Sequence, residues 1–193
     1  MTFSEQINDL FEHEKWMDAR RLLEQRLKAE PDSHWLLTRL GTAYYEQKNY
    51  KKALNLSEKA YKLAPHCPLV LWDLASTLEM LGADLGAVKF YTQLFQKGVR
   101  GIAEDECGEG VVWAQSLLAD CLYSVAGCLY RLGNEKAPWF IRQHLEWRAA
   151  GIKSIYSARE ARDRLLEISG ASLSRVIEQG AGEAGKALEL VGT

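Results

Sequence analysis

The chain has 193 residues, of which 47% are hydrophobic and 26% are charged, and its formal net charge is −2. This length supports one hydrophobic core or one array of repeats without disulfides or metals to hold it together. The nearly balanced charge offers no broad basic surface for nucleic acid or for an acidic membrane, so we expect neither as a partner.

The first twenty residues, MTFSEQINDLFEHEKWMDAR, contain no apolar run, and no stretch of the chain approaches eighteen apolar residues. We therefore expect no signal peptide, no membrane span and a cytoplasmic location. The four cysteines show no paired spacing, so the expectation in a reducing compartment is buried or idle thiols.

The sequence repeats with a period of 34 residues. Small and apolar residues recur at this step, and the recurring sets are Ala19, Ala53 and Ala87; Leu27, Tyr61 and Phe95; Trp16 and Tyr50; and Pro31 and Pro65. The set Leu37, Leu40, Gly41 and Tyr44 recurs as Leu71, Leu74, Ala75 and Leu78. A fixed period of this length is typical of solenoid proteins.

Within residues 34–67 the pattern predicts an antiparallel helix pair. The apolar positions of the first half recur every three or four residues, QKNY supplies a turn, and Pro65 ends the second helix. Gly41 has no side chain, so we expect the second helix to approach closely there. Such a pair has a one-sided apolar face, which must be buried by stacking on neighbouring pairs.

These residues resemble the tetratricopeptide repeat, whose pattern runs W-x₂-L-G-x₂-Y, then A-x₃-F, then P. The resemblance implies an all-α, right-handed superhelical array of about four helix pairs over residues 1–152. The expected units are 1–33, 34–67, 68–101 and 119–152, with an insert at 102–118. Residues 34–67 match best, although Leu37 replaces the Trp and Ser57 the Phe.

The fourth unit follows the third after 51 residues, which is one period plus seventeen. Leu122, Val125, Ala126 and Leu129 repeat the Leu71 set, and residues 111–132 read as one long helix. Beyond it we expect C-terminal capping helices at 153–180, the first starting with Ser157 and Glu160 in capping-box spacing and the second at 172–179. We expect a flexible tail at 181–193.

A phosphate-binding loop at 180–188 is not expected. GAGEAGKAL has the spacing of such a loop, but Ala187 replaces the hydroxyl that would hold magnesium.

The resemblance implies that the first helix of each pair lines a concave groove that receives peptides. The positions carried over as the candidate groove are Asn8, Trp35, Thr38, Arg39, Thr42, Tyr45, Leu69, Trp72, Asp73, Ser76, Tyr123 and Tyr130. Ser4, Asp120, Ser124 and Gly127 occupy further lining positions. Aromatic rings with a few polar groups are typical of binding hot spots. The alternative for Trp35 and Trp72 is packing against their own neighbours.

A carboxylate clamp of the kind that chaperone cochaperones use is not expected. The corresponding residues are Ser4, Asn8, Arg39, Leu69 and Asp73, and only Asn8 agrees with that clamp. Asp73 would repel a carboxylate.

No catalytic pattern is present, so we expect a protein that is not an enzyme and needs no cofactor. The histidines lie in no H-E-x-x-H context and there is no G-x-S-x-G elbow. A zinc site from Cys107, Cys121, Cys128 and His144 is an alternative. The seven-residue step from Cys121 to Cys128 is equally that of two core positions on one helix, so we predict no metal site.

The sequence therefore predicts a non-catalytic scaffold that binds a partner peptide or helix in the groove. One alternative is a self-associating subunit or assembly chaperone that forms a homo-oligomer through the apolar end faces or the long helix 111–132. A metal-binding or enzymatic accessory is a further alternative.

Overall fold

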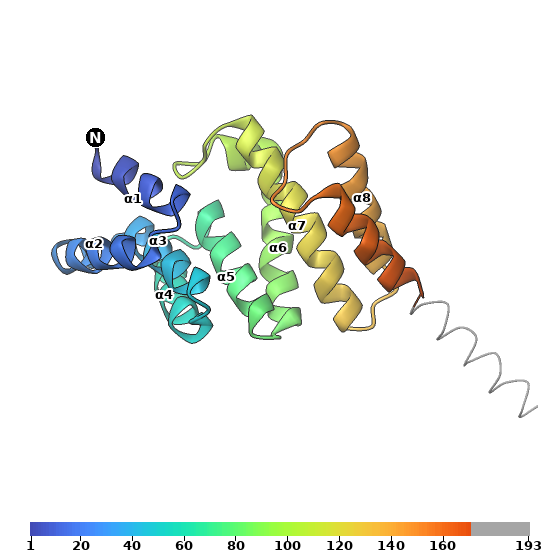
Figure 1. Cartoon of the computed structure of the whole chain (residues 1–193), viewed down its shortest axis with the longest axis horizontal. Coiled ribbons are helices and arrows are strands. Elements are labelled where there is room, and N and C mark those ends of the chain that lie inside the picture. Colours follow the sequence, from blue (N-terminus) through green and yellow to red (C-terminus); the bar gives the residue numbers. More distant parts are fainter. Residues whose placement is uncertain (171–193) are drawn as a thin grey trace, which may run out of the picture.

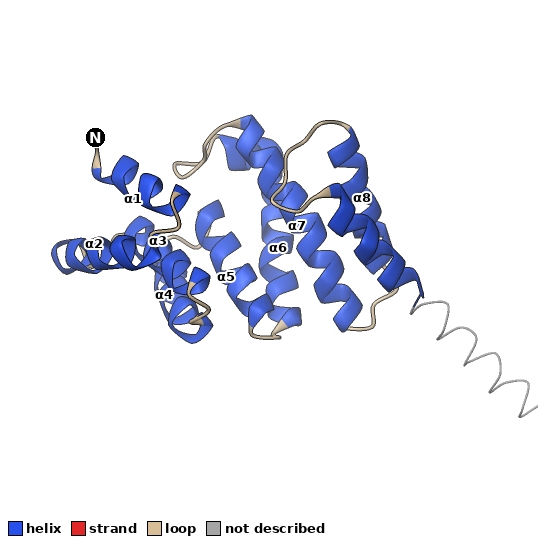
Figure 2. Cartoon of the chain, in the orientation of Figure 1, coloured by secondary structure: helices blue, strands red, loops and turns tan. Residues whose placement is uncertain are grey.

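The computed structural model describes residues 1–170, and these form a stack of antiparallel helix pairs with no strand among them (Figures 1 and 2). The helices are α1 (Phe3–Glu12), α2 (Trp16–Ala29), α3 (His34–Glu46), α4 (Tyr50–Leu63), α5 (Pro68–Met80), α6 (Asp84–Ala103), α7 (Val111–Arg131) and α8 (Ala137–Ala149). A further helix, which we name the C-terminal helix, begins at residue 158 and continues to residue 170. The predicted all-α repeat solenoid is confirmed.

The expectations for the last residues lie outside the described part of the chain. These are the helix at 172–179, the flexible tail at 181–193 and the rejected phosphate loop at 180–188.

The four pairs share one turn geometry. The turn inside each pair contains a residue with left-handed backbone, and these are Glu14 (φ 53°), Lys48 (φ 60°), Gly82 (φ 74°) and Gly133 (φ 70°). In each turn the next residue donates its N–H to the carbonyl five positions earlier, at 2.8–2.9 Å. This is the bond of a Schellman motif, which satisfies a carbonyl at the end of the first helix. The backbone thus repeats at the sequence period, including the longer fourth step.

At the turn residue Gly82, a side chain would lower the free energy of unfolding through the backbone conformation alone. A Cβ added there meets nothing within 4 Å, so sterics with neighbours play no part. We expect Gly82→Ala to lower the free energy of unfolding by about 1 kcal/mol, because alanine avoids left-handed backbone. Chemical denaturation followed by circular dichroism measures this change.

Gly41→Ala is the matched control. An added Cβ at Gly41 would lie 3.6 Å from Ser57 Oγ and 3.7 Å from Leu56 Cβ, which are ordinary contacts. The approach of α4 is therefore less tight than the sequence suggested, and the third unit has Ala75 at this position. We expect Gly41→Ala to stabilise the helix by up to about 1 kcal/mol. Equal effects of the two substitutions would contradict this account of the turn.

The core is a series of apolar clusters between successive pairs. Leu23 and Leu36 join the first two pairs, while Leu71, Tyr91 and Cys121 belong to the largest cluster, which α5, α6 and α7 share. These clusters are built from the repeated small and apolar positions. Stacking of neighbouring helix pairs buries those positions, as expected for pairs with a one-sided apolar face.

The segment between the third and fourth units is mostly helical. α6 continues to Ala103 through a break at Gly98 (φ 65°, ψ 176°), and α7 starts at Val111. Only residues 104–110 form a loop, so the expected insert 102–118 consists of the end of α6, this loop and the first two turns of α7. The loop lies beside the second unit, where Glu109 is 3.9 Å from the Arg39 guanidinium (Figure 1).

α7 is the one helix among residues 1–170 with the length and composition to cross a membrane. It lies inside the stack, with 72% of its most apolar window buried. This is the burial of a core helix, and it leaves little of the helix surface free for the self-association considered above.

Candidate binding groove

A cavity of about 330 Å³ opens between the first helices of the second, third and fourth units. We call it the groove. Its lining residues from these helices are Gly41, Thr42, Tyr45, Glu46, Trp72, Asp73, Ser76, Thr77, Glu79, Met80 and Tyr123. Four residues beyond the repeats complete it: Ile155, Tyr156, Glu160 and Arg164. The groove is therefore bounded by the repeat array on one side and by the C-terminal segment on the other.

Aromatic rings from three helices form the apolar part of the groove. Trp72 of α5 rests on the buried Tyr91 ring of α6, with centroids 5.6 Å apart. Tyr45 of α3 contacts Tyr50 edge-on at 5.3 Å. Trp72 and Tyr45 are only half-buried, so each presents ring surface to the cavity. Rigid aromatic side chains of this kind give a partner large contact area at little entropic cost.

Asp73 is the polar centre of the groove. Its Oδ2 accepts a hydrogen bond from Thr42 Oγ1 at 3.1 Å. Burial raises the pKa of Asp73 to about 7, although the Arg39 guanidinium and the Thr42 hydroxyl act in the opposite direction. The Arg39 Nε is itself buried and has no hydrogen-bond partner among the described residues. In the groove, the Arg39 charge and the Thr42 hydrogen bond thus do not offset the cost of desolvating the ionised Asp73 carboxyl group.

Asp73→Asn should stabilise the protein, increasingly as the pH rises. The pKa of Asp73 is raised on folding from 3.8 to about 7. Protonation of Asp73 therefore contributes most to the stability of the folded protein below pH 3.8, and this contribution is lost as the pH rises to 7. Asparagine can still accept from Thr42 but carries no charge. We expect a gain of about 1–3 kcal/mol in unfolding free energy at pH 8 and a smaller gain at pH 5.

The measurement is urea denaturation of both proteins across this pH range. Thr42→Val tests the hydrogen bond separately and should destabilise the wild type most at high pH. A gain from Asp73→Asn that is independent of pH would contradict the assigned burial of the carboxyl group.

The C-terminal segment covers the groove face of the fourth unit. Asp120 Oδ1 accepts hydrogen bonds from Ser154 Oγ at 2.5 Å and from the Ile155 N–H at 3.0 Å. The Tyr156 ring stacks on Tyr123 at 3.8 Å. The C-terminal helix then starts with the capping box that the sequence suggested, in which the N–H groups of Ser157 and Glu160 each bond to the other residue's side chain.

Arg164 extends this cover along α7. Its guanidinium lies 4.2 Å from the centre of the Tyr123 ring, and a Cβ at Gly127 would collide with it. The positions in α7 that the resemblance assigned to a ligand are therefore contacted by the protein's own chain.

Half of the twelve candidate groove residues line the cavity: Thr42, Tyr45, Trp72, Asp73, Ser76 and Tyr123. The other six do not. Thr38 is buried and bonds to the His34 carbonyl, while Trp35 packs edge-on against Phe3 and beside the Arg39 guanidinium. For Trp35 the packing alternative thus describes the structure.

The remaining candidates lie away from the cavity for different reasons. Leu69 packs against the apolar cluster between the second and third units, and Tyr130 packs under the C-terminal helix. Asn8 is exposed on α1. Arg39 acts on the groove through its charge near Asp73, not as a lining residue.

Nine lining residues were not among the candidates: Gly41, Glu46, Thr77, Glu79 and Met80 on α3 and α5, and the four residues of the C-terminal segment. Tyr156 and Arg164 lie outside the repeat, so no periodic signal points to them. The short serine and tyrosine run before the capping box at Ser157 is the one feature that could have drawn attention to this segment.

The alternative zinc site is wrong as a set of four. Cys121 and Cys128 are buried in the main core cluster, and His144 Nδ1 contacts the Ala119 carbonyl at 2.8 Å. Cys107 lies elsewhere, beside His34 and Cys67.

A second cavity of about 580 Å³ lies on the opposite side of α7, between α6 and α8. It is strongly apolar, and Trp139 at its rim is 54% exposed. This outer cavity is the strongest competitor of the groove as a contact surface.

The comparisons agree with this architecture. The nearly identical tetratricopeptide-like repeats assigned to a kinesin light chain of Podosopora anserina share 16% identity and a TM-score of 0.63 with this chain, covering 96% of it and 92% of the repeat protein. A Q17M variant of those repeats gives a TM-score of 0.64 at 16% identity, covering 95% of this chain and 91% of the variant. MamA gives 0.56 at 15% identity, covering 90% of this chain and 98% of MamA. No curated protein sequence matches the chain significantly.

These structural likenesses concern the fold, and the family assignment comes from sequence. The family described as tetratricopeptide repeat matches residues 5–66 and 38–96. These ranges cover the first two units and most of the third, where the period of 34 is clearest. Proteins of this family generally mediate protein–protein interactions. Residues 5–96 of the chain therefore contain tetratricopeptide repeats.

Proposed function

We propose that this protein is a non-catalytic adaptor that binds a partner peptide or helix in the groove. The observation that carries the proposal is the groove itself, which combines half-buried aromatic rings with a half-buried carboxyl group of raised pKa in one cavity. The proposed binding role is also supported by the general role of tetratricopeptide repeats in binding proteins. We propose a cytoplasmic location for this role.

The charge around the groove favours a partner with a basic residue. Glu46 and Asp73 face the same cavity, and the pKa of each carboxyl is raised mainly by burial. A cation placed beside them would recover the electrostatic energy that burial costs. A carboxylate ligand would instead add negative charge to a cavity that four carboxyl groups and one arginine already line, which agrees with the expectation against a chaperone-type clamp.

The cost of keeping Asp73 in the groove also supports a binding role. An asparagine at this position would keep the Thr42 hydrogen bond without the energetic cost of desolvating a charge. Groups that reduce stability are common at functional sites, where activity and stability compete.

A variant that fills the groove tests the proposal while the packing of the lining side chains is kept. Ser76 lies on the cavity wall and donates only to the Asp73 carbonyl one turn earlier, at 3.2 Å. We expect Ser76→Arg to abolish capture of partner proteins from lysate of the source organism, because the long side chain occupies the space of the ligand. Mass spectrometry of the captured proteins provides the measurement.

Ser116→Arg is the matched control. Ser116 lies on α7 away from the groove, and its hydroxyl likewise donates to a carbonyl of its own helix, that of Val112 at 3.1 Å. This variant should capture the same partners as wild type. Capture that survives in a folded Ser76→Arg protein would contradict binding in the groove and would move the contact surface to the outer cavity. Capture of the chain itself in both variants would instead support the self-associating alternative.

A further inference from the structure

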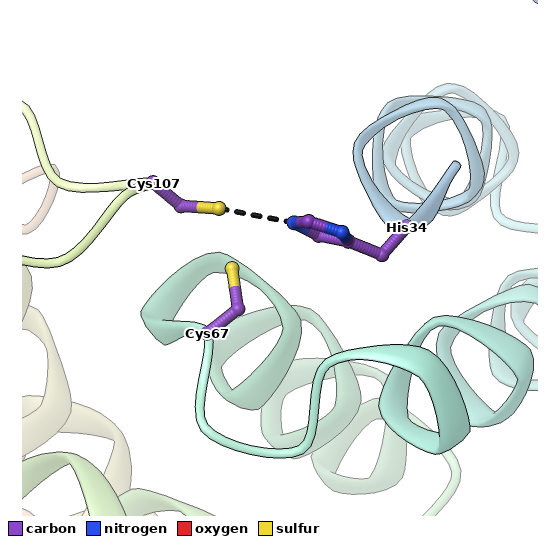
Figure 3. A group of neighbouring side chains, drawn as sticks. All are labelled: His34, Cys67 and Cys107. Carbon is purple, nitrogen blue, oxygen red and sulfur yellow. Dashed lines mark hydrogen bonds between the residues drawn. The ribbon is translucent and has the colours of Figure 1, made fainter. Parts of the chain in front are cut away.

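Three side chains with metal-binding atoms converge beside the second unit. His34 is the first residue of α3, Cys67 precedes α5, and Cys107 lies in the loop between α6 and α7. One ligand atom from each lies within 4.8 Å of the others. Figure 3 shows the imidazole of His34 and the two sulfur atoms pointing toward a common space.

The spacing suits a metal ion with soft ligands. A zinc ion lies about 2.3 Å from cysteine sulfur and about 2.0–2.1 Å from histidine nitrogen, so its ligands are separated by about 3.5–4 Å in a tetrahedron. His34 Nε2 is already 3.1 Å from Cys107 Sγ. Small side-chain rotations within the observed cluster would therefore give three zinc ligands without a change of backbone.

The backbone around Cys107 holds the third ligand in place. Asp105 Oδ1 accepts the Cys107 N–H at 3.1 Å, while its Oδ2 pairs with Lys97 Nζ at 3.0 Å. A Cβ at Gly108 would collide with the Ile102 carbonyl oxygen, so the tight loop requires glycine there. Ligands that are fixed by an outer shell of hydrogen bonds are a common property of metal sites.

Cys67 occupies a position where cysteine does little for the helix. It is the N-cap of α5 but makes no side-chain capping bond, whereas Ser33, one period earlier, caps α3 through the Leu36 N–H. Serine is a far better N-cap residue than one whose side chain makes no capping hydrogen bond. The Cys67 sulfur instead points toward His34 and Cys107 (Figure 3).

We propose that His34, Cys67 and Cys107 bind a zinc ion that fastens the α6–α7 loop to the second and third units. Binding releases the two thiol protons to solvent and leaves two thiolates that balance the charge of the ion. The fourth position takes a water molecule or an exposed side chain, Glu106 or His66, both of which line the same cavity of about 200 Å³. The site is distinct from the groove and does not depend on the proposed function.

Zinc and cobalt titrations of the metal-free, reduced full-length protein test this proposal. We expect about one equivalent of zinc per chain, and thiolate-to-cobalt charge-transfer absorption when Co²⁺ is the probe. Free zinc at about 100 times its dissociation constant should raise the melting temperature by about 5–10 °C.

Cys67→Ser is the informative variant because it removes a ligand while adding a capping hydroxyl. It should fold as stably as the metal-free wild type and lose the zinc-dependent shift in melting temperature. Cys107→Ser should lose the shift as well. Cys128→Ser, which changes a core cysteine outside the cluster, should keep it.

Three results would overturn the proposal. One is binding of less than about a tenth of an equivalent by the wild type in excess zinc. Another is an unchanged zinc response in both Cys67→Ser and Cys107→Ser. The third is a Cys67–Cys107 disulfide in protein that was alkylated during lysis, since it would identify the pair as a redox couple.

Discussion

A Tyr91→Ala variant is expected to lose about 3–5 kcal/mol of unfolding free energy, the largest stability change of those considered. The Tyr91 side chain is completely buried in the cluster shared by α5, α6 and α7. Its ring supports Trp72, and its hydroxyl donates to Glu79 Oε2 at 3.0 Å. The truncation therefore leaves a cavity beneath the groove as well as an unpaired carboxylate oxygen. Denaturant titration followed by circular dichroism measures the loss.

Tyr91→Phe separates the ring from the hydroxyl. This variant keeps the support of Trp72 and removes one hydrogen bond, while Glu79 still pairs with Arg131 at 3.1 Å. We expect a loss of about 1–2 kcal/mol, with partner binding retained. Similar losses in the two variants would mean that the ring contributes little to the core, which would contradict the packing described here.

Trp72→Ala should weaken partner binding about 30- to 1000-fold, which corresponds to the 2–4 kcal/mol of a strong hot spot. Trp72 presents the largest ring in the groove and is held from behind by Tyr91, so little entropy is lost when a partner covers it. Isothermal titration with a peptide from the captured partner measures the change. Trp72→Phe should recover part of the affinity.

Trp139→Ala is the control for tryptophan removal. Trp139 lies on α8 at the outer cavity and is about half exposed. Its removal should leave the affinity within about twofold of wild type, since it does not contact the groove. A larger loss in Trp139→Ala than in Trp72→Ala would place the binding surface on the outer side of the array.

The part of this structure that follows from the sequence is the part that repeats. Ala53 and Ala87 mark where second helices pack, and QKNY marks the turn that contains Lys48, because each unit packs its helices in the same way. Local rules also predict Ser157 and Glu160 correctly as a capping box, since both partners lie within one turn of helix. In the groove, Trp72 and Asp73 could be located because the resemblance to the tetratricopeptide repeat assigns lining positions to the first helix of each pair.

The features that the sequence does not reveal depend on contacts between distant segments. Tyr156 reaches Tyr123 because the chain turns back after α8, and no periodic pattern records that turn. Cys107 meets His34 across 73 residues because the α6–α7 loop lies beside the second unit. The sequence instead suggested grouping Cys107 with Cys121, Cys128 and His144, because Cys121 and Cys128 share a helix face. Spacing along one helix predicts which residues share a face but does not predict which loop contacts that face.

Site-specific photo-crosslinking is a direct test of whether the partner binds in the groove. A photoreactive phenylalanine analogue would replace Tyr45 in the groove in one protein and Trp139 at the outer cavity in another, and both would be irradiated with the captured partner. We expect the partner to be crosslinked from position 45 and not from position 139, and we expect Ser76→Arg to remove the crosslink. Crosslinking from position 139 alone would contradict binding in the groove.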